Sequence, residues 1–149
     1  MASIRKGTRI SLLILAAVML LAQAFRIDKT NPPVQSDIST NSEAHALLRR
    51  ACYNCHSSET VWPWYSNVAP VSWLLASDVQ EGRGHVNFSE WGTYSSAVQS
   101  HKLAAIAEEV RGGEMPPWYY ALLHAEARLG TAERTSIADW AETSSQAPR

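Results

Sequence analysis

Two cysteines and a histidine lie within five consecutive residues of this chain. They form the run Cys52-Tyr53-Asn54-Cys55-His56, which contains the only cysteines among the 149 residues. The pattern C-x-x-C-H is the attachment signature of a c-type haem: two thiols add across the vinyl groups of one porphyrin, and the adjacent imidazole binds the iron. If residues 51–56 are helical, Cys52 and His56 share a face because they are four apart. One helical turn would then carry both the covalent attachment and an axial ligand.

Other chemistries also use a C-x-x-C pair. The pair occurs in thioredoxin-like redox sites, in zinc sites and as a structural disulfide. A closed zinc site would need two more ligands, which only scattered histidines could supply. A redox pair is expected in a βαβ context, whereas the flanking residues favour helices. We therefore favour haem attachment, with the thiol and zinc interpretations as alternatives.

A methionine downstream of the motif is the predicted second axial ligand. Met115 is the only methionine outside the N-terminal segment, and it lies between Gly112-Gly113 and Pro116-Pro117. A thioether is a common sixth ligand of c-type haem and raises the reduction potential relative to a second histidine. The proline that follows would stiffen the loop presenting the sulfur. The alternatives are a methionine that only packs in the core and ligation by His124 instead.

Helices must position these residues. A capping box at Thr40 and Glu43 predicts a helix through residues 44–51 that leads directly into Cys52. Three aromatic residues in the proline-containing loop 61–70 are predicted to form a wall of the haem pocket, with their polar groups available to a haem propionate: Trp62, Trp64 and Tyr65. The alternative is a hydrophobic cluster under a loop.

The remaining elements are also predicted to be helical. We expect a helix from Pro70 that stops at Gly82, then a turn over residues 83–87. Further helices are expected from a capping box at Asn87 and Glu90, from the apolar spacing of residues 103–110 ending at Gly112-Gly113, over residues 118–124, and from an N-cap at Thr131.

The N-terminal residues have the features of an export segment. Three basic residues precede an apolar run over residues 11–22, and Ala22-Gln23-Ala24 fits a cleavage site. The same run extended over residues 10–25 would suit a retained membrane anchor. In both alternatives the rest of the chain is exported across the cytoplasmic membrane. Covalent haem attachment is completed on that side of the membrane.

Length and composition are consistent with one small domain plus this segment. Hydrophobic residues make up 46% of the chain, and the net charge of −1 argues against nucleic-acid binding. The sequence contains no glycine-rich phosphate loop and no hydrolase-like order of Ser, His and Asp. We expect four parts: a signal peptide or membrane anchor (1–24), a linker (25–40), a haem-binding domain (41–142) and a flexible tail (143–149).

Several short runs together resemble one family. They are Asn31–Pro33, Cys52–Tyr65, Phe88–Trp91, Gly113–Pro117 and Tyr120–Leu129. With them, residues 30–142 resemble the bacterial haem-binding domain family, small exported proteins related to c-type cytochromes. One departure is Ala125, where the family pattern has a proline after the histidine.

The resemblance implies an all-α, cytochrome-c-like domain around one haem c. It implies covalent attachment through Cys52 and Cys55 and iron ligation by His56, and Met115 matches the Met-Pro pair of the family pattern. We expect the helix before Cys52 to pack across the last helix.

The expected function is electron transfer rather than catalysis. The domain would bind one haem c and pass single electrons to and from redox partner proteins, in the periplasm or at the outer face of the membrane. One alternative is a haem-based sensor or gas-binding module in which Met115 is displaced. A further alternative is a peroxidase-like enzyme, for which His124 or His85 would be the acid–base group.

Overall fold

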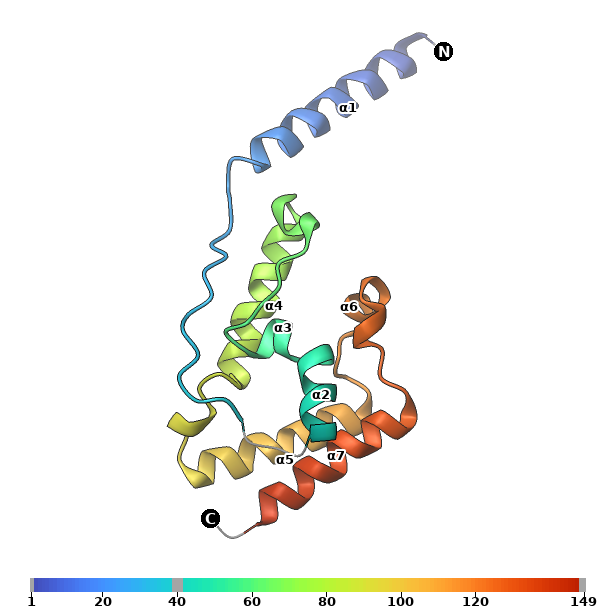
Figure 1. Cartoon of the computed structure of the whole chain (residues 1–149). Coiled ribbons are helices and arrows are strands. Elements are labelled where there is room, and N and C mark those ends of the chain that lie inside the picture. The colour runs from blue at the N-terminus through green and yellow to red at the C-terminus, as the bar shows by residue number, and fades with distance from the viewer. Residues whose placement is uncertain (1, 39–41, 148–149) are drawn as a thin grey trace. The chain divides into compact units, whose positions relative to one another are not determined.

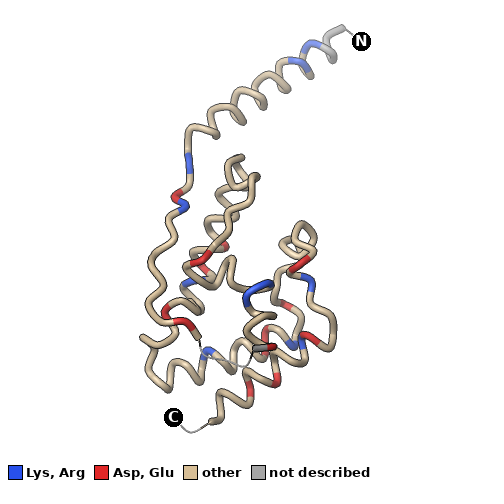
Figure 2. The backbone as a smooth tube through the Cα atoms, viewed as in Figure 1, with Lys and Arg blue, Asp and Glu red and all other residues tan. Residues whose placement is uncertain are grey.

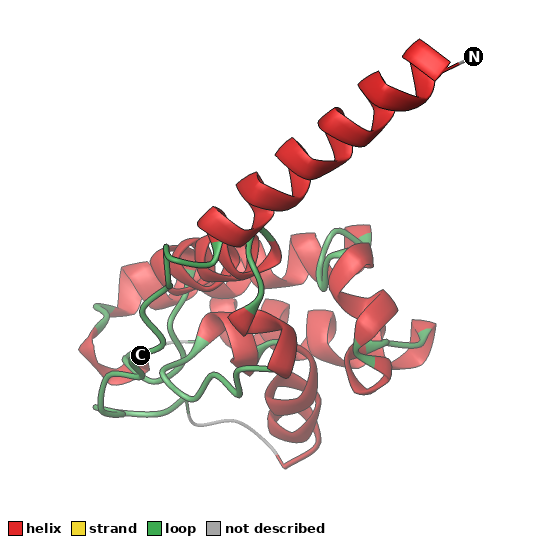
Figure 3. Cartoon of the chain, turned by 90° about the horizontal axis from the view of Figure 1, so that it is seen from above, coloured by secondary structure: helices red, strands yellow, loops and turns green. Residues whose placement is uncertain are grey.

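The protein is described by a computed structural model that covers residues 2–38 and 42–147 (Figure 1). The predicted all-α class is confirmed, because these residues form helices and loops and no strand beyond an isolated bridge between Ser36 and Glu90 (Figure 3). The α-helices are α1 (Ala2–Ala22), α2 (Ser42–Ala51), α3 (Tyr53–His56), α4 (Val71–His85), α5 (Ser96–Gly112), α6 (Trp118–Leu123) and α7 (Thr131–Gln146). Three short 3₁₀ helices are η1 (Trp64–Asn67), η2 (Trp91–Thr93) and η3 (Ala125–Ala127).

The chain divides into two compact units. The first unit combines residues 1–30 with residues 62–78, and the second combines residues 31–61 with residues 79–149. Helix α4 begins in the first unit and ends in the second. The C-x-x-C-H motif, Met115 and His124 all belong to the second unit.

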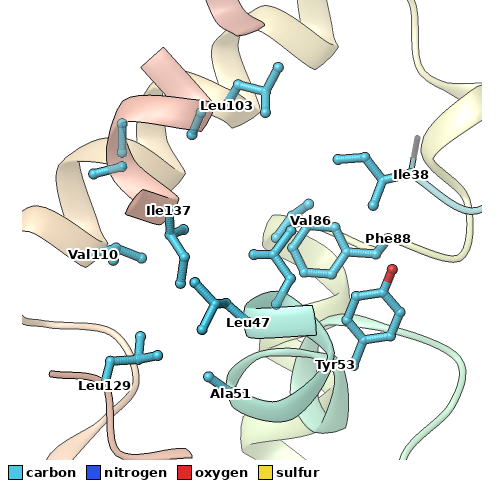
Figure 4. Close-up of a cluster of buried hydrophobic side chains, with 14 of the residues drawn as sticks. Ile38, Leu47, Ala51, Tyr53, Val86, Phe88, Leu103, Val110, Leu129 and Ile137 are labelled. Atoms are coloured by element: carbon cyan, nitrogen blue, oxygen red, sulfur yellow. The ribbon is translucent and has the colours of Figure 1, made fainter. Parts of the chain in front are cut away.

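The core of the second unit is one hydrophobic cluster. Helices α5 and α7 form its most extensive helix pair, contributing Leu103 and Val110 from α5 and Ile137 from α7 (Figure 4). Helix α2 packs against α7 and contributes Leu47 to the cluster, so the helix before Cys52 packs against the last helix as predicted. Tyr53, within the motif, also belongs to this cluster, which therefore joins the motif to the core.

Phe88 is the largest fully buried side chain of this core. It is 1% exposed, and its ring stacks on that of Tyr53 at a centroid distance of 5.1 Å. We expect Phe88→Ala to lower the free energy of unfolding by about 3–5 kcal/mol, because a large cavity would open beside the motif. Chemical denaturation measures this loss. Leu122→Ala on the exposed surface of α6 is the control, and equal losses for the two variants would contradict this role of Phe88.

Several helix boundaries differ from those predicted. Helix α4 continues through Gly82 to His85, so the turn predicted over residues 83–87 begins later than expected. Helix α5 starts at Ser96 because the Ser95 hydroxyl accepts a hydrogen bond from the Val98 N–H at 3.4 Å.

At the last helix, the N-cap is Gly130 rather than Thr131. The Glu133 carboxylate accepts a hydrogen bond from the Gly130 N–H at 2.9 Å, and helix α7 then extends to Gln146, into the predicted tail. A short helix follows Glu90, but it is the 3₁₀ turn η2 rather than a helix that includes Phe88. The capping box predicted at Thr40 lies outside the described residues.

In the first unit, the residues after α1 are bound to the segment before α4. The Gln23 side chain donates to the Ala69 carbonyl at 3.1 Å and accepts from the Ala69 N–H at 2.9 Å. Trp73 Nε1 donates to the Phe25 carbonyl at 3.0 Å.

Helix α1 carries basic residues only near its start (Figure 2). Within the described part of the chain, none of the helices combines the length and the apolar character needed to cross a membrane.

Candidate functional site

The C-x-x-C-H residues form a helical turn directly after α2. The Cys52 N–H donates to the Leu48 carbonyl at 2.8 Å, and the His56 N–H donates to the Cys52 carbonyl at 2.9 Å. Cys52 itself, with φ of −123°, separates α2 from α3. The predicted helical arrangement is therefore present, and both thiols and the imidazole lie within one turn.

The imidazole of His56 is oriented by the main chain of α4 and of Val86, which directly follows it. Its Nδ1 lies 2.9 Å from the Gly82 carbonyl oxygen and 3.3 Å from that of Val86. Because a carbonyl oxygen only accepts, Nδ1 carries the hydrogen and Nε2 carries the lone pair. In the described structure no hydrogen bond is made to Nε2. Burial lowers the pKa of His56, so the ring is neutral near pH 7.

This state of His56 is the metal-binding state of a histidine. A ligating histidine nearly always donates its other ring N–H to a carbonyl or carboxylate, which fixes both the tautomer and the ring orientation. The Gly82 carbonyl supplies this acceptor to His56. The side chain is thus prepared to bind a metal ion through Nε2.

Gly82 allows α4 to approach the motif closely. A Cβ atom at this position would lie 2.7 Å from the Cys55 carbonyl oxygen and 3.1 Å from the Cys55 Cβ, closer than side chains pack. Sequence reasoning assigned Gly82 to the end of a helix, and this assignment is wrong. The glycine lies inside α4 because only a residue without a side chain fits against Cys55.

Neither of the two cysteines forms a disulfide, and both are half-buried. Burial, and next the neighbouring Cys55, raise the pKa of Cys52 to about 12. A thioredoxin-like redox pair instead needs a cysteine whose pKa is lowered, so this environment disfavours that interpretation. Among the described residues, no group of three or more His, Cys, Asp and Glu side chains is arranged to hold a metal ion.

Asn54 connects the motif to two other segments. Its side chain donates to the Tyr120 hydroxyl of α6 at 2.8 Å and accepts from the Val61 N–H at 3.0 Å. The main-chain carbonyl of Asn54 accepts a hydrogen bond from the Thr60 hydroxyl at 2.7 Å. Sequence reasoning treated Asn54 as a variable position of the motif, and no sequence signal indicates these contacts.

Arg83 fixes the residues that follow the motif. Its Nε donates to the Ser57 carbonyl at 2.8 Å, and its Nη2 donates to the Thr60 hydroxyl at 3.0 Å and to the Asn31 side-chain oxygen at 2.8 Å. Sequence reasoning placed Arg83 in a turn. Because α4 continues to His85, Arg83 is instead held on a helix beside the motif.

Met115 lies in the short loop between α5 and α6. The loop begins at Gly113, whose positive φ of 86° ends α5, and it is tied to α7 because Arg134 donates to the Met115 carbonyl at 2.6 Å. The Met115 side chain is half-buried and packs against the same hydrophobic core cluster as Cys52. The predicted ligand and the motif thus border one core.

His124 is linked to the motif through Tyr120. Its ring stacks on that of Tyr120 at 4.0 Å, and its Nδ1 lies 3.0 Å from the Tyr120 carbonyl oxygen. Tyr120 in turn accepts the hydrogen bond from Asn54. His85, the other candidate acid–base group, is exposed at the end of α4.

The residues of the predicted aromatic wall belong to the second segment of the first unit, which starts at Trp62. Trp62 Nε1 is buried and has no hydrogen-bond partner among the described residues. Trp64, by contrast, is 78% exposed. The contact of these residues with a porphyrin stays a prediction.

A comparison with protein families gives a match over most of the chain. Residues 17–143 match the family described as a haem-binding domain. The matched region contains Cys52, Cys55, His56 and Met115. No match is found among curated proteins or among solved structures.

Proposed function

The chain belongs to the haem-binding domain family, and on this premise we propose that it carries one covalently attached haem c and transfers single electrons. The resemblance noted in the sequence is thereby confirmed at the level of the family. The proposal extends to a cytochrome-c-like arrangement of the helices and to a location outside the cytoplasm, in the periplasm or at the outer face of the membrane.

The preparation of His56 is the observation that carries the proposal. Its ring is neutral, its Nδ1 is bound by the Gly82 carbonyl, and its Nε2 lone pair is left for iron. The thiols of Cys52 and Cys55 lie within the same helical turn, and neither is part of a disulfide. These residues fit a haem c in number, chemistry and order along the chain.

Cys52 and Cys55 are the residues that would hold the haem covalently. Each thiol would add its sulfur to one carbon of a vinyl group and its hydrogen to the other, and this addition balances without an oxidant or reductant. Burial keeps Cys52 in the protonated thiol form, which would provide both atoms. Asn54 and Arg83 hold the backbone around the motif, which would keep the two cysteines in position.

The rigidity of this frame supports a role in electron transfer. When bound, the haem iron supplies a one-electron couple between its ferric and ferrous states. His56 is fixed by α4, and the Met115 loop is fixed to α7 by Arg134. Ligands on such supports would move little when the charge on the metal changes. The half-buried positions of both cysteines support an accessible edge at which redox partner proteins dock.

The identity of the second axial ligand is tested by Met115→Ala. We expect the oxidised protein to lose the weak long-wavelength absorption band of Met–iron ligation, because the variant has no sulfur to bind the iron. The haem content, measured as the pyridine haemochrome, should stay unchanged. Absorption spectra of the wild-type chain and of the variant provide the comparison.

The matched control for this experiment is His124→Ala. The long-wavelength band should persist in this variant, and its loss there would assign the ligand to His124 instead. A wild-type ferrous protein that is high-spin and binds carbon monoxide rapidly would contradict electron transfer. It would instead indicate a sensor or gas-binding module.

A further inference from the structure

The first unit exposes a concentration of large apolar side chains. They are Phe25 (71% exposed), Trp64 (78%), Val68 (44%), Val71 (44%), Trp73 (41%) and Leu74 (55%), which we call the apolar patch. All but Phe25 fall within eleven consecutive residues, and the Trp73 indole is hydrogen-bonded to the Phe25 carbonyl at 3.0 Å. Exposed apolar surface concentrated in this way marks an interaction site.

The apolar patch lies next to the end of α1. The Gln23 side chain, directly after the helix, makes two hydrogen bonds to the main chain of Ala69, which lies between Val68 and Val71. These hydrogen bonds hold the C-terminal end of α1 beside the apolar patch. Whatever environment covers the end of α1 also reaches the apolar patch.

Helix α1 identifies that environment. From residue 10 to residue 22 it has no charged side chain, and its large apolar residues are exposed all around the helix: Ile10, Leu12, Leu13, Ile14, Leu15, Val18, Met19, Leu20 and Leu21. A helix that is apolar on every side belongs either inside a protein core or in lipid. The first unit provides no such core around it, because these side chains are exposed.

The chemistry of the apolar patch and its surroundings favours a lipid surface. Tryptophan is enriched at the membrane–water boundary because its ring is apolar and its N–H is polar. Three of the five basic residues of the first unit, Arg5, Lys6 and Arg9, lie near the start of α1, away from the patch. The two near the patch, Arg26 and Lys29, are balanced by Asp28 and Asp78, so the contact rests on apolar side chains rather than on charge.

We propose that the apolar patch is a membrane contact, which lies on the lipid–water boundary beside the apolar residues 10–22 of α1. The contact goes beyond attachment through the N-terminal helix, because it brings folded residues of η1 and α4 onto the bilayer surface. It uses neither the motif nor Met115. Trp64 also belongs to the aromatic wall predicted for the haem pocket, whereas Val68, Val71, Trp73 and Leu74 do not.

Lipid labelling of the full-length chain tests the proposal. The protein is reconstituted into vesicles of phosphatidylcholine and phosphatidylglycerol that contain a small fraction of phospholipid with a diazirine in its acyl chain. After irradiation and proteolysis, mass spectrometry locates the labelled peptides. We expect residues 64–74 to be labelled several-fold more than residues 118–123 of α6, where Trp118 is equally exposed at 78%. Equal labelling of the two segments, or labelling confined to α1, would overturn the proposal.

Charge substitutions provide the matched test. In the double variant Val71→Glu with Leu74→Glu, labelling of residues 64–74 should fall several-fold. Leu122→Glu with Leu123→Glu, on the exposed surface of α6, should leave this labelling unchanged. Because the first variant changes α4, the wild-type map is an independent measurement if that variant does not fold. Chain-to-chain cross-links at residues 64–74 in place of lipid adducts would show that a second copy covers the apolar patch, and the proposal would then be wrong.

Discussion

Gly82→Ala is expected to destabilise the protein and to lower the fraction of chains that carry haem. The new Cβ would lie 2.7 Å from the Cys55 carbonyl oxygen, so α4 would have to move away from the motif. We expect a loss of about 1–3 kcal/mol in the free energy of unfolding, which is typical of overpacking. The loss should appear even though alanine favours a helix interior by about 1 kcal/mol over glycine.

Movement of α4 would also remove the acceptor of His56. The Gly82 carbonyl fixes the imidazole tautomer, and second-shell partners of this kind commonly change metal affinity by about 10–100-fold. The measurements are chemical denaturation and the yield of haem-stained protein on a denaturing gel. These two readouts separate the general effect on stability from the effect on haem loading.

The matched control is Gly84→Ala in the same helix. A Cβ at Gly84 would meet no atom within 4 Å, so this variant should be more stable than the wild type by about 0.5–1 kcal/mol. Its haem content should not change. If both glycine variants behaved alike, the close approach at Cys55 would not be the reason for Gly82.

Cys52→Ser together with Cys55→Ser should abolish covalent haem attachment. A serine hydroxyl does not replace the thiol that adds to a vinyl group, so no thioether would form at either position. After expression with a c-type maturation system, the wild-type chain should carry the mass of one haem and should stain on a denaturing gel. The double variant should have the mass of the bare polypeptide and should not stain.

The control for the cysteine variant is Met115→Ala. Met115 takes no part in attachment, so this variant should retain both the haem mass and the staining. A wild-type chain without covalent haem would refute the central proposal, and so would staining that survives in the double cysteine variant. Neither result would bear on the lipid contact of the first unit.

Local patterns in the sequence were sufficient to predict the presence of most helices and the helical turn of the motif. The apolar positions around Leu103 and Val110 recur at helical spacing, and they face the core in α5. The spacing of Cys52 and His56 likewise predicted one shared turn, which the main-chain hydrogen bonds form. Family membership was predictable from several short runs, because each of them stays contiguous in the sequence.

Contacts between distant residues were not predictable. Gly82 resembles a helix stop when only its neighbours are considered, but its role is set by Cys55, which lies far from it in the chain. Asn54 and Arg83 have the same property, since their partners Tyr120 and Ser57 are identified only by the folded arrangement. The division into two units also depends on contacts between residues that are far apart in the sequence.

The hydrogen bonds that hold the Met115 loop have a consequence for the engineering of position 115. Arg134 binds the carbonyl oxygens of Met115 and Val110, and neither contact depends on which side chain occupies position 115. The anchor of the loop is thus separate from the group that the loop presents. A single substitution at position 115 would therefore change the side chain while the loop keeps its attachment to α7.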